Sequence, residues 1–226
     1  MVNEAENLFE HLKTDFFRLR VEWRLYRSLW GTNKETFDML QSISASTSQT
    51  LEAIVFERVL LGLRKLTDPP HGRRMSAKSV SIRALPKYFD DGEKTLTKLV
   101  SSSLKSSSFA RNWSDKRIAH SDFEYRVGNA QLEPASRAKV EKALESIATI
   151  IKWIARNHFD TTLITHPIPP LSDERTFLRC LYEGKQEMER KRELSKQLSL
   201  QGRYEERNKL REMPDWLKRS EPPIDS

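Results

Sequence analysis

Apolar residues recur at steps of three and four along most of the chain, the spacing that places side chains on one face of an α-helix. The first such stripe predicts a helix over about residues 3–30. A second stripe predicts a helix over about 47–66, and so little of its circumference is polar that we expect it to be the central, most enclosed helix. A third stripe predicts a last core helix from Pro134 to about Asn157.

Turn-forming residues separate and end these stripes. The pair Pro69 and Pro70 must end the second helix, because proline lacks the backbone N–H and clashes with the preceding turn. A short helix over 79–85 stops near Pro86. Residues 90–122 are mostly helix-prone, but serine clusters at 101–103 and 106–108 predict a break in the middle.

The order of these segments predicts an all-α protein of two parts. With 226 residues and only seven glycines, the chain suits helices better than a loop-rich or all-β design. We expect an antiparallel helical bundle over residues 1–166 and a proline-rich, extended linker over 167–171. A charged helical arm with a loose tail should follow over 172–226.

Charge narrows the class of partner. The chain carries a formal net charge of +7, which favours a polyanionic partner, with RNA or DNA ahead of a membrane surface. The segment from Leu171 onward holds 13 basic and 12 acidic residues, so the excess of positive charge belongs to the bundle.

The sequence also indicates the compartment. Cys180 is the only cysteine, which excludes an internal disulfide and a cysteine-based zinc site and fits a reducing cytoplasm. The acidic, polar N-terminal stretch does not resemble a secretory signal, and no apolar run is long enough to span a membrane.

Candidate chemistry is concentrated in residues 112–123, which read NWSDKRIAHSDF. If Phe109 to His120 formed one regular helix, Trp113, Lys116 and His120 would share a face with Phe109, and Arg117 would lie beside His120. A histidine can pass protons during cleavage of a phosphodiester while neighbouring cations stabilise the developing charge. The alternative is that His120 caps a helix end or bonds a carbonyl in a packed corner.

The remaining histidines do not add a metal site. They have no metal-like spacing with acidic residues along the sequence, and we expect structural or surface roles for them and no metal or cofactor. These histidines are His11, His71, His158 and His166.

Three blocks of sequence resemble a known family. The segments DKRIAHSD (115–122), VLLGLRKLTDPP (59–70) and SVSIRAL (79–85) look like the AbiU-like, abortive-infection branch of the HEPN superfamily, with the resemblance covering about residues 5–165. The resemblance implies a bundle of four or more helices, commonly a homodimer whose two motif sites face each other. It also implies metal-independent ribonuclease activity in many members, used in toxin–antitoxin or antiphage defence, in which a motif arginine and histidine act on the scissile phosphate.

One position departs from the family motif, because Ser114 stands where the motif arginine is expected. Serine carries neither the charge nor the fork of donors of arginine. We therefore expect His120 as general acid/base with Arg117 as its catalytic partner. Expected substrate contacts are Lys116, Arg111, Asp115 and Asp122. On a regular helix Arg111 would lie on the opposite side, so it could contribute only through a kink or from a second protomer.

Two other functions remain open at this point. The chain could be a non-catalytic HEPN module that binds RNA, a nucleotide or a protein partner. It could also be an interaction scaffold, such as the partner half of a toxin–antitoxin pair.

Overall fold

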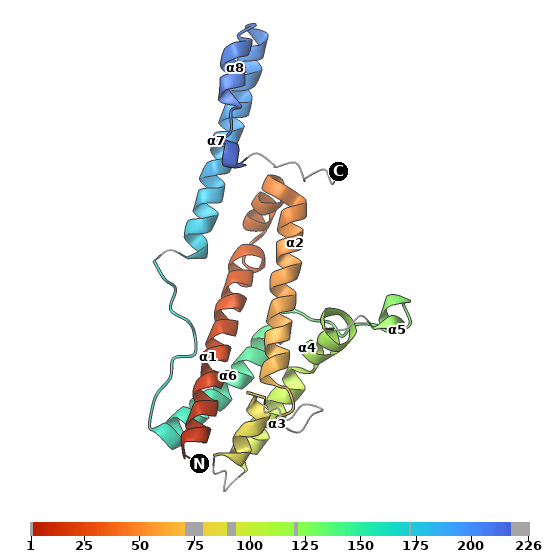
Figure 1. Ribbon diagram of the computed structural model, residues 1–226, viewed down its shortest axis with the longest axis vertical. Helices are drawn as coiled ribbons and strands as arrows, with labels where there is room; N and C mark the ends of the chain where they lie inside the picture. The colour runs from red at the N-terminus through yellow and green to blue at the C-terminus, as the bar shows by residue number, and fades with distance from the viewer. Residues whose placement is uncertain (1, 71–78, 90–93, 120–121, 172, 218–226) are drawn as a thin grey trace, which may run out of the picture. The chain divides into compact units, whose positions relative to one another are not determined.

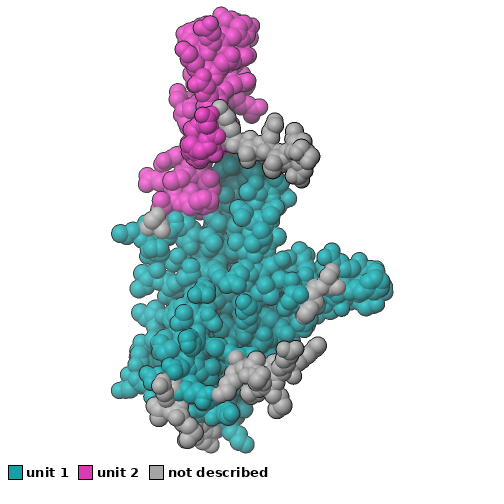
Figure 2. Space-filling model, viewed as in Figure 1, with its two compact units in different colours: residues 1–174 teal, residues 175–226 magenta. Residues whose placement is uncertain are grey.

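The computed structural model describes residues 2–70, 79–89, 94–119, 122–171 and 173–217, and these residues form helices joined by turns, with no strand among them (Figure 1). The all-α prediction is confirmed. The chain divides into two compact units, residues 1–174 and residues 175–226 (Figure 2). Within the described ranges, no helix is both long enough and apolar enough to cross a membrane.

Unit 1 is an antiparallel bundle. Its principal helices are α1 (Val2–Tyr26), α2 (Lys34–Leu66), α3 (Thr95–Ser106), α4 (Ser108–Trp113) and α6 (Arg137–Phe159). Shorter elements are η1 (Arg27–Gly31), η2 (Ile82–Lys87), η3 (Ser114–Ile118) and α5 (Phe123–Arg126). Helices α1 and α2 run side by side in opposite directions, α3 packs on α6, and α6 also contacts α1 and α2 (Figure 1).

The first predicted stripe is buried as expected. Phe9, Leu12, Phe16, Leu19 and Trp23 of α1 all lie in the core. The predicted helix over 3–30 is confirmed, although its last turn is the π-helix η1, which buries Leu29 and Trp30.

Helix α2 differs from its prediction in two respects. It begins at Lys34, capped by the side chain of Asn33, and it kinks at Ser44, which has a non-helical φ of −160°. The expectation that the 47–66 region is the most enclosed helix is wrong, because Leu51 and Ile54 are 46% and 57% exposed. The more enclosed helix is α6, in which a stripe from Val140 to Ala155 is buried on its core face.

The expected breaks fall close to their predicted positions. Helix α3 ends at Ser106 and α4 begins at Ser108, within the predicted serine-rich break. Residues 160–171 contain no helix, as the prolines require. The prolines at 69 and 70 follow the end of α2 at Leu66.

Unit 2 contains most of α7 (Glu174–Leu200), α8 (Tyr204–Leu210) and η4 (Asp215–Leu217). Gly202, with a φ of 71°, separates α7 from α8, because this left-handed conformation suits glycine and ends a helix. Ion pairs three or four residues apart, such as Arg179 with Glu183, run along α7. Several charged residues of this arm are thus paired with near neighbours along the chain.

A buried arginine joins α1 to α6. Arg20 is 3% exposed, and its Nη1 lies 3.1 Å from Glu141 Oε1 while its Nη2 pairs with Glu145 Oε1. Glu141 also accepts a hydrogen bond from Trp23 Nε1 at 2.5 Å. A buried guanidinium needs such partners, since leaving a buried charge unpaired costs several kcal/mol.

Substituting Gly62 tests the close approach of α1 and α2. A Cβ at this position would lie 2.5 Å from Leu19 Cδ1, and Leu19 is itself buried. Overpacking a core costs ~1–3 kcal/mol and exceeds the ~1 kcal/mol that alanine gains in a helix, so Gly62→Ala should lower the free energy of unfolding by about 1 kcal/mol. Gly184→Ala in α7 is the matched control, because nothing lies within 4 Å of its Cβ. Chemical denaturation measures both variants, and a Gly62→Ala protein as stable as the parent would contradict the tight packing.

The acid stability of unit 1 should depend on Glu145. Burial raises the pKa of the Glu145 carboxyl, but the hydrogen bond and charge of Arg20 outweigh it, so the net pKa lies below its usual value. A carboxyl whose folded-state pKa is lowered stabilises the fold above its unfolded pKa, and this contribution is lost as the pH falls. Between about pH 5 and pH 3, the midpoint temperature of unfolding should fall less steeply with decreasing pH in Glu145→Gln than in the parent. Glu10→Gln, which removes an exposed carboxylate paired with Lys13 in α1, should keep the parental slope.

Candidate functional site

The motif segment leaves the regular helix directly after Trp113. It forms the π-helix η3, in which the Ala119 N–H donates to Ser114 O at 2.9 Å, five residues back. The condition stated for a shared face, one regular helix from Phe109 to His120, is therefore not met, because the helix changes to a π turn at Ser114. Single π turns within helices are frequent at functional sites because they redirect side chains. His120 itself lies outside the described residues.

Three hydrogen bonds hold the segment around residues 131–133 against the motif. Trp113 Nε1 donates to Glu133 O at 2.7 Å, and Asn112 Oδ1 accepts from the Glu133 N–H at 2.9 Å. Lys116 Nζ donates to Gln131 O at 2.9 Å. Lys116, an expected substrate contact, is thus engaged with a backbone carbonyl.

Arg117 points toward the middle of α2. Its Nε lies 3.0 Å from Glu57 Oε1, and its guanidinium lies over the ring of Trp113, 5.5 Å from the centroid. Arg117 and Lys116 therefore bind different parts of the fold, and the structure does not bring these two cations together.

Arg111 points instead to the C-terminal end of α2. Its Nη2 donates to Thr67 O at 3.0 Å and lies 3.4 Å from Asp68 Oδ1. A cation at this position is stabilised by the carbonyl end of the helix. Asp115 turns to the same end, where its Oδ1 lies 3.3 Å from Arg64 Nη2, so Arg111 and Asp115 border one site.

Arg64, Arg83 and Arg111 together form what we call the arginine cluster. Burial lowers the pKa of the Arg64 guanidinium, and the positive charge of Arg111 lowers it further. Burial and the charge of Arg111 likewise lower the pKa of Arg83. Arg64 also pairs with Asp68. Among the described residues, neither Arg64 Nε nor Arg83 Nε has a hydrogen-bond acceptor.

The other two motif residues have structural positions. Ser114, where the motif arginine was expected, is 3% exposed. Asp122, an expected substrate contact, caps α5 by accepting a hydrogen bond from the Tyr125 N–H at 2.8 Å. Neither side chain can replace the positive charge of the motif arginine, because serine is uncharged and aspartate is acidic.

Sequence reasoning did not select Arg64 and Arg83 as site residues. Both lie in the apolar blocks VLLGLRKL and SVSIRAL, where arginine occurs among buried positions. A charge in such a run needs a partner or a ligand, because burying an unpaired charge is costly. An arginine within an apolar block was therefore the feature of the sequence that could have identified Arg64 and Arg83 as site residues.

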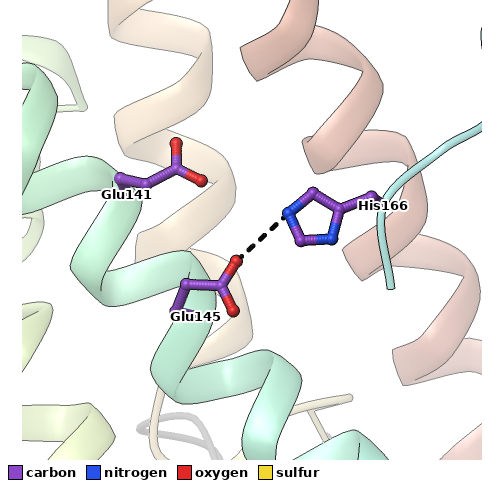
Figure 3. Close-up of side chains that lie close together, drawn as sticks. All are labelled: Glu141, Glu145 and His166. Carbon is purple, nitrogen blue, oxygen red and sulfur yellow. Dashed lines mark ion pairs between the residues drawn. The ribbon is translucent and has the colours of Figure 1, made fainter. Parts of the chain in front are cut away.

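The fold also brings together Glu141, Glu145 and His166, whose candidate ligand atoms lie within 4.8 Å of one another (Figure 3). His166 Nε2 lies 3.4 Å from Glu145 Oε1, a proximity that the sequence spacing did not indicate. Both carboxylates already bind the guanidinium of Arg20. A metal ion would have to approach this buried positive charge, so the residues fit an ion-pair network better than a metal site.

Comparison with known proteins identifies the family. The family model HEPN_AbiU2, described as AbiU2, matches residues 3–177. No curated protein and no solved structure matched the chain in the corresponding comparisons. The resemblance seen in the three sequence blocks is confirmed over more than three quarters of the chain. The chain therefore belongs to the AbiU2 family of the HEPN superfamily.

Proposed function

We propose that this abortive-infection HEPN protein acts on RNA, binding backbone phosphates through the arginine cluster and cleaving the strand without a metal ion. The observation that carries this proposal is that Arg64 and Arg111 pair with the same Asp68 carboxylate beside the motif segment, with Arg83 near enough for the charges to act on one another. Three guanidinium groups held close together repel one another, and an anion placed among them relieves that repulsion.

Phosphate suits this cluster for geometric and electrostatic reasons. Guanidinium groups bind phosphate oxygens through paired, charge-assisted hydrogen bonds. Asp68 and Asp115 pair with Arg64 and Arg111 and offset part of the charge, which leaves one cation in excess.

The proposed cleavage step uses His120 as general acid/base and a nearby cation to stabilise the phosphorane-like transition state. The ribose 2′-hydroxyl attacks the adjacent phosphorus as a base accepts its proton, and the 5′-oxygen leaves with a proton from an acid. Ser114 cannot supply the cation of the family motif. Arg111 is the replacement we favour over Arg117, because Arg111 belongs to the cluster whereas Arg117 pairs with Glu57. In a homodimer, a second copy of the chain would complete this site.

A second candidate function is RNA binding without cleavage. The burial of Ser114 favours it, because no side chain at the position of the motif arginine reaches the solvent. Loss of a transition-state cation typically reduces a rate about 10²–10³-fold, which would leave binding intact.

RNA binding should depend on the arginine cluster. Arg83→Gln and Arg111→Gln should each weaken binding of a labelled single-stranded RNA about tenfold at low salt, and each should reduce the slope of log K against log[salt] by about 0.7. Arg179→Gln is the matched control, because it removes an exposed arginine of α7 that pairs with Glu183. Fluorescence anisotropy across a salt series measures all four proteins. Parental affinity in both cluster variants, or binding that does not respond to salt, would refute the proposed interface.

Cleavage is tested separately with labelled single-stranded and structured RNA in the presence of EDTA. The parent should cut RNA, His120→Ala should not, and Arg111→Gln should cut about 10²–10³-fold more slowly. Arg117→Ala, which retains the cluster, should cut within a few-fold of the parent. If the RNA stays intact while salt-sensitive binding persists, the protein is a binding module and the cleavage proposal fails.

A further inference from the structure

A cavity of about 210 Å³ lies beside Arg117, between α1, α2 and the motif segment. Its walls include Tyr26 of α1, Glu52, Phe56 and Glu57 of α2, and Trp113 and Arg117 of the motif segment. Pockets for drug-sized ligands have volumes of ~300–1,000 Å³, so this cavity suits a smaller group such as a single planar ring system.

Aromatic side chains form the apolar walls of the cavity. The rings of Phe56 and Trp113 meet edge to face with centroids 6.0 Å apart, and those of Tyr26 and Phe56 lie 5.2 Å apart. The hydrogen bond from Trp113 to Glu133 O fixes the indole in place. Preorganised aromatic rings bind nucleobases by stacking, and this contribution is largely independent of sequence.

The polar wall residues present both acceptors and donors: Glu52, Glu57, Tyr26, Arg117 and Gln49. Glu52 accepts a hydrogen bond from Tyr26 Oη at 3.3 Å. Burial and the charge of Glu52 raise the pKa of Tyr26 to about 12, so the tyrosine remains a neutral donor at physiological pH. Glu57 and Arg117 lie side by side at 3.0 Å and together present a carboxylate and a guanidinium.

The charges at the cavity distinguish it from the arginine cluster. Two carboxylates, Glu52 and Glu57, face one guanidinium, Arg117, so the cavity disfavours a phosphate and favours a neutral group with several donors. Glu57 and Arg64 are seven residues apart on α2, a rise of about 10 Å. A short single strand can span this distance with a phosphate at the cluster and a base in the cavity.

We propose that this cavity binds a guanine base of a single-stranded RNA. The proposal rests on the RNA-directed function above and adds a base-specific subsite to it. Guanine has two adjacent donors, N1–H and the N2 amino group, that match a carboxylate, and it has O6 and N7 as acceptors for an arginine. Adenine, cytosine and uracil lack this pair of adjacent donors next to an acceptor, so the polar walls select guanine while the aromatic walls bind any base.

The test compares short RNAs of about six nucleotides that differ at one central base in a uridine context. The guanine-containing RNA should bind the parent about tenfold more tightly than the RNAs with adenine, cytosine or uracil at that position. Ala53 also lines the cavity, and Ala53→Trp should fill it and abolish the preference for guanine. Ala45→Trp is the matched control, because Ala45 is an exposed residue of α2 outside the cavity, and it should retain the preference.

A second variant makes the test independent of cavity filling. Glu57→Gln replaces a carboxylate with an amide and should reduce the guanine preference at least about threefold, whereas the general salt-sensitive affinity should persist. Circular dichroism and thermal unfolding confirm that each variant folds.

The outcomes separate the two proposals. Equal, salt-sensitive binding of all four RNAs by the parent would overturn the guanine subsite and leave RNA binding in place. A guanine preference that survives both Ala53→Trp and Glu57→Gln would likewise show that the cavity is not the subsite. Absence of salt-sensitive binding to any RNA would refute the proposed function itself.

Discussion

The packing of the motif segment on α2 is the constraint on which the site depends. Helix α4 and the π turn η3 both contact α2, and the π turn changes the direction of successive side chains after Trp113. Arg111 of α4 and Asp115 of η3 reach the C-terminal end of α2, while Arg117 reaches Glu57 about two turns away. The motif segment therefore places charged side chains at two separate positions along α2.

The result is a separation of charge along α2. The helix end gathers three arginines against two aspartates, and the middle of the helix presents two glutamates against one arginine. The first arrangement suits a phosphate and the second suits a base with hydrogen-bond donors. This division explains why Arg117, the predicted catalytic cation, pairs with a carboxylate, whereas Arg111 belongs to the more positive group.

The buried polar groups of the bundle elsewhere serve mainly to hold helices together. Arg20 binds Glu141 and Glu145 across the interface of α1 and α6, and His166 approaches the same carboxylates. An ion-pair network of this kind fixes the relative positions of helices at a cost of desolvation, and it leaves little room for a cation. It therefore supports the bundle that positions α2 and the motif.

Local sequence determined much of the fold. The stripes of α1 and α6 follow from hydrophobic periodicity, whereas the break between α3 and α4 and the extended segment follow from serine and proline. The three sequence blocks also identified the family. The exposure of Leu51 and Ile54 did not follow, because the number of neighbours around a helix is a property of the whole bundle. The π turn at Ser114 was also not predicted from the sequence, because local sequence encodes such turns only weakly. Only the tertiary structure brought together the arginine cluster and the aromatic walls of the cavity. The members of each group lie far apart in the chain and meet only when the helices pack.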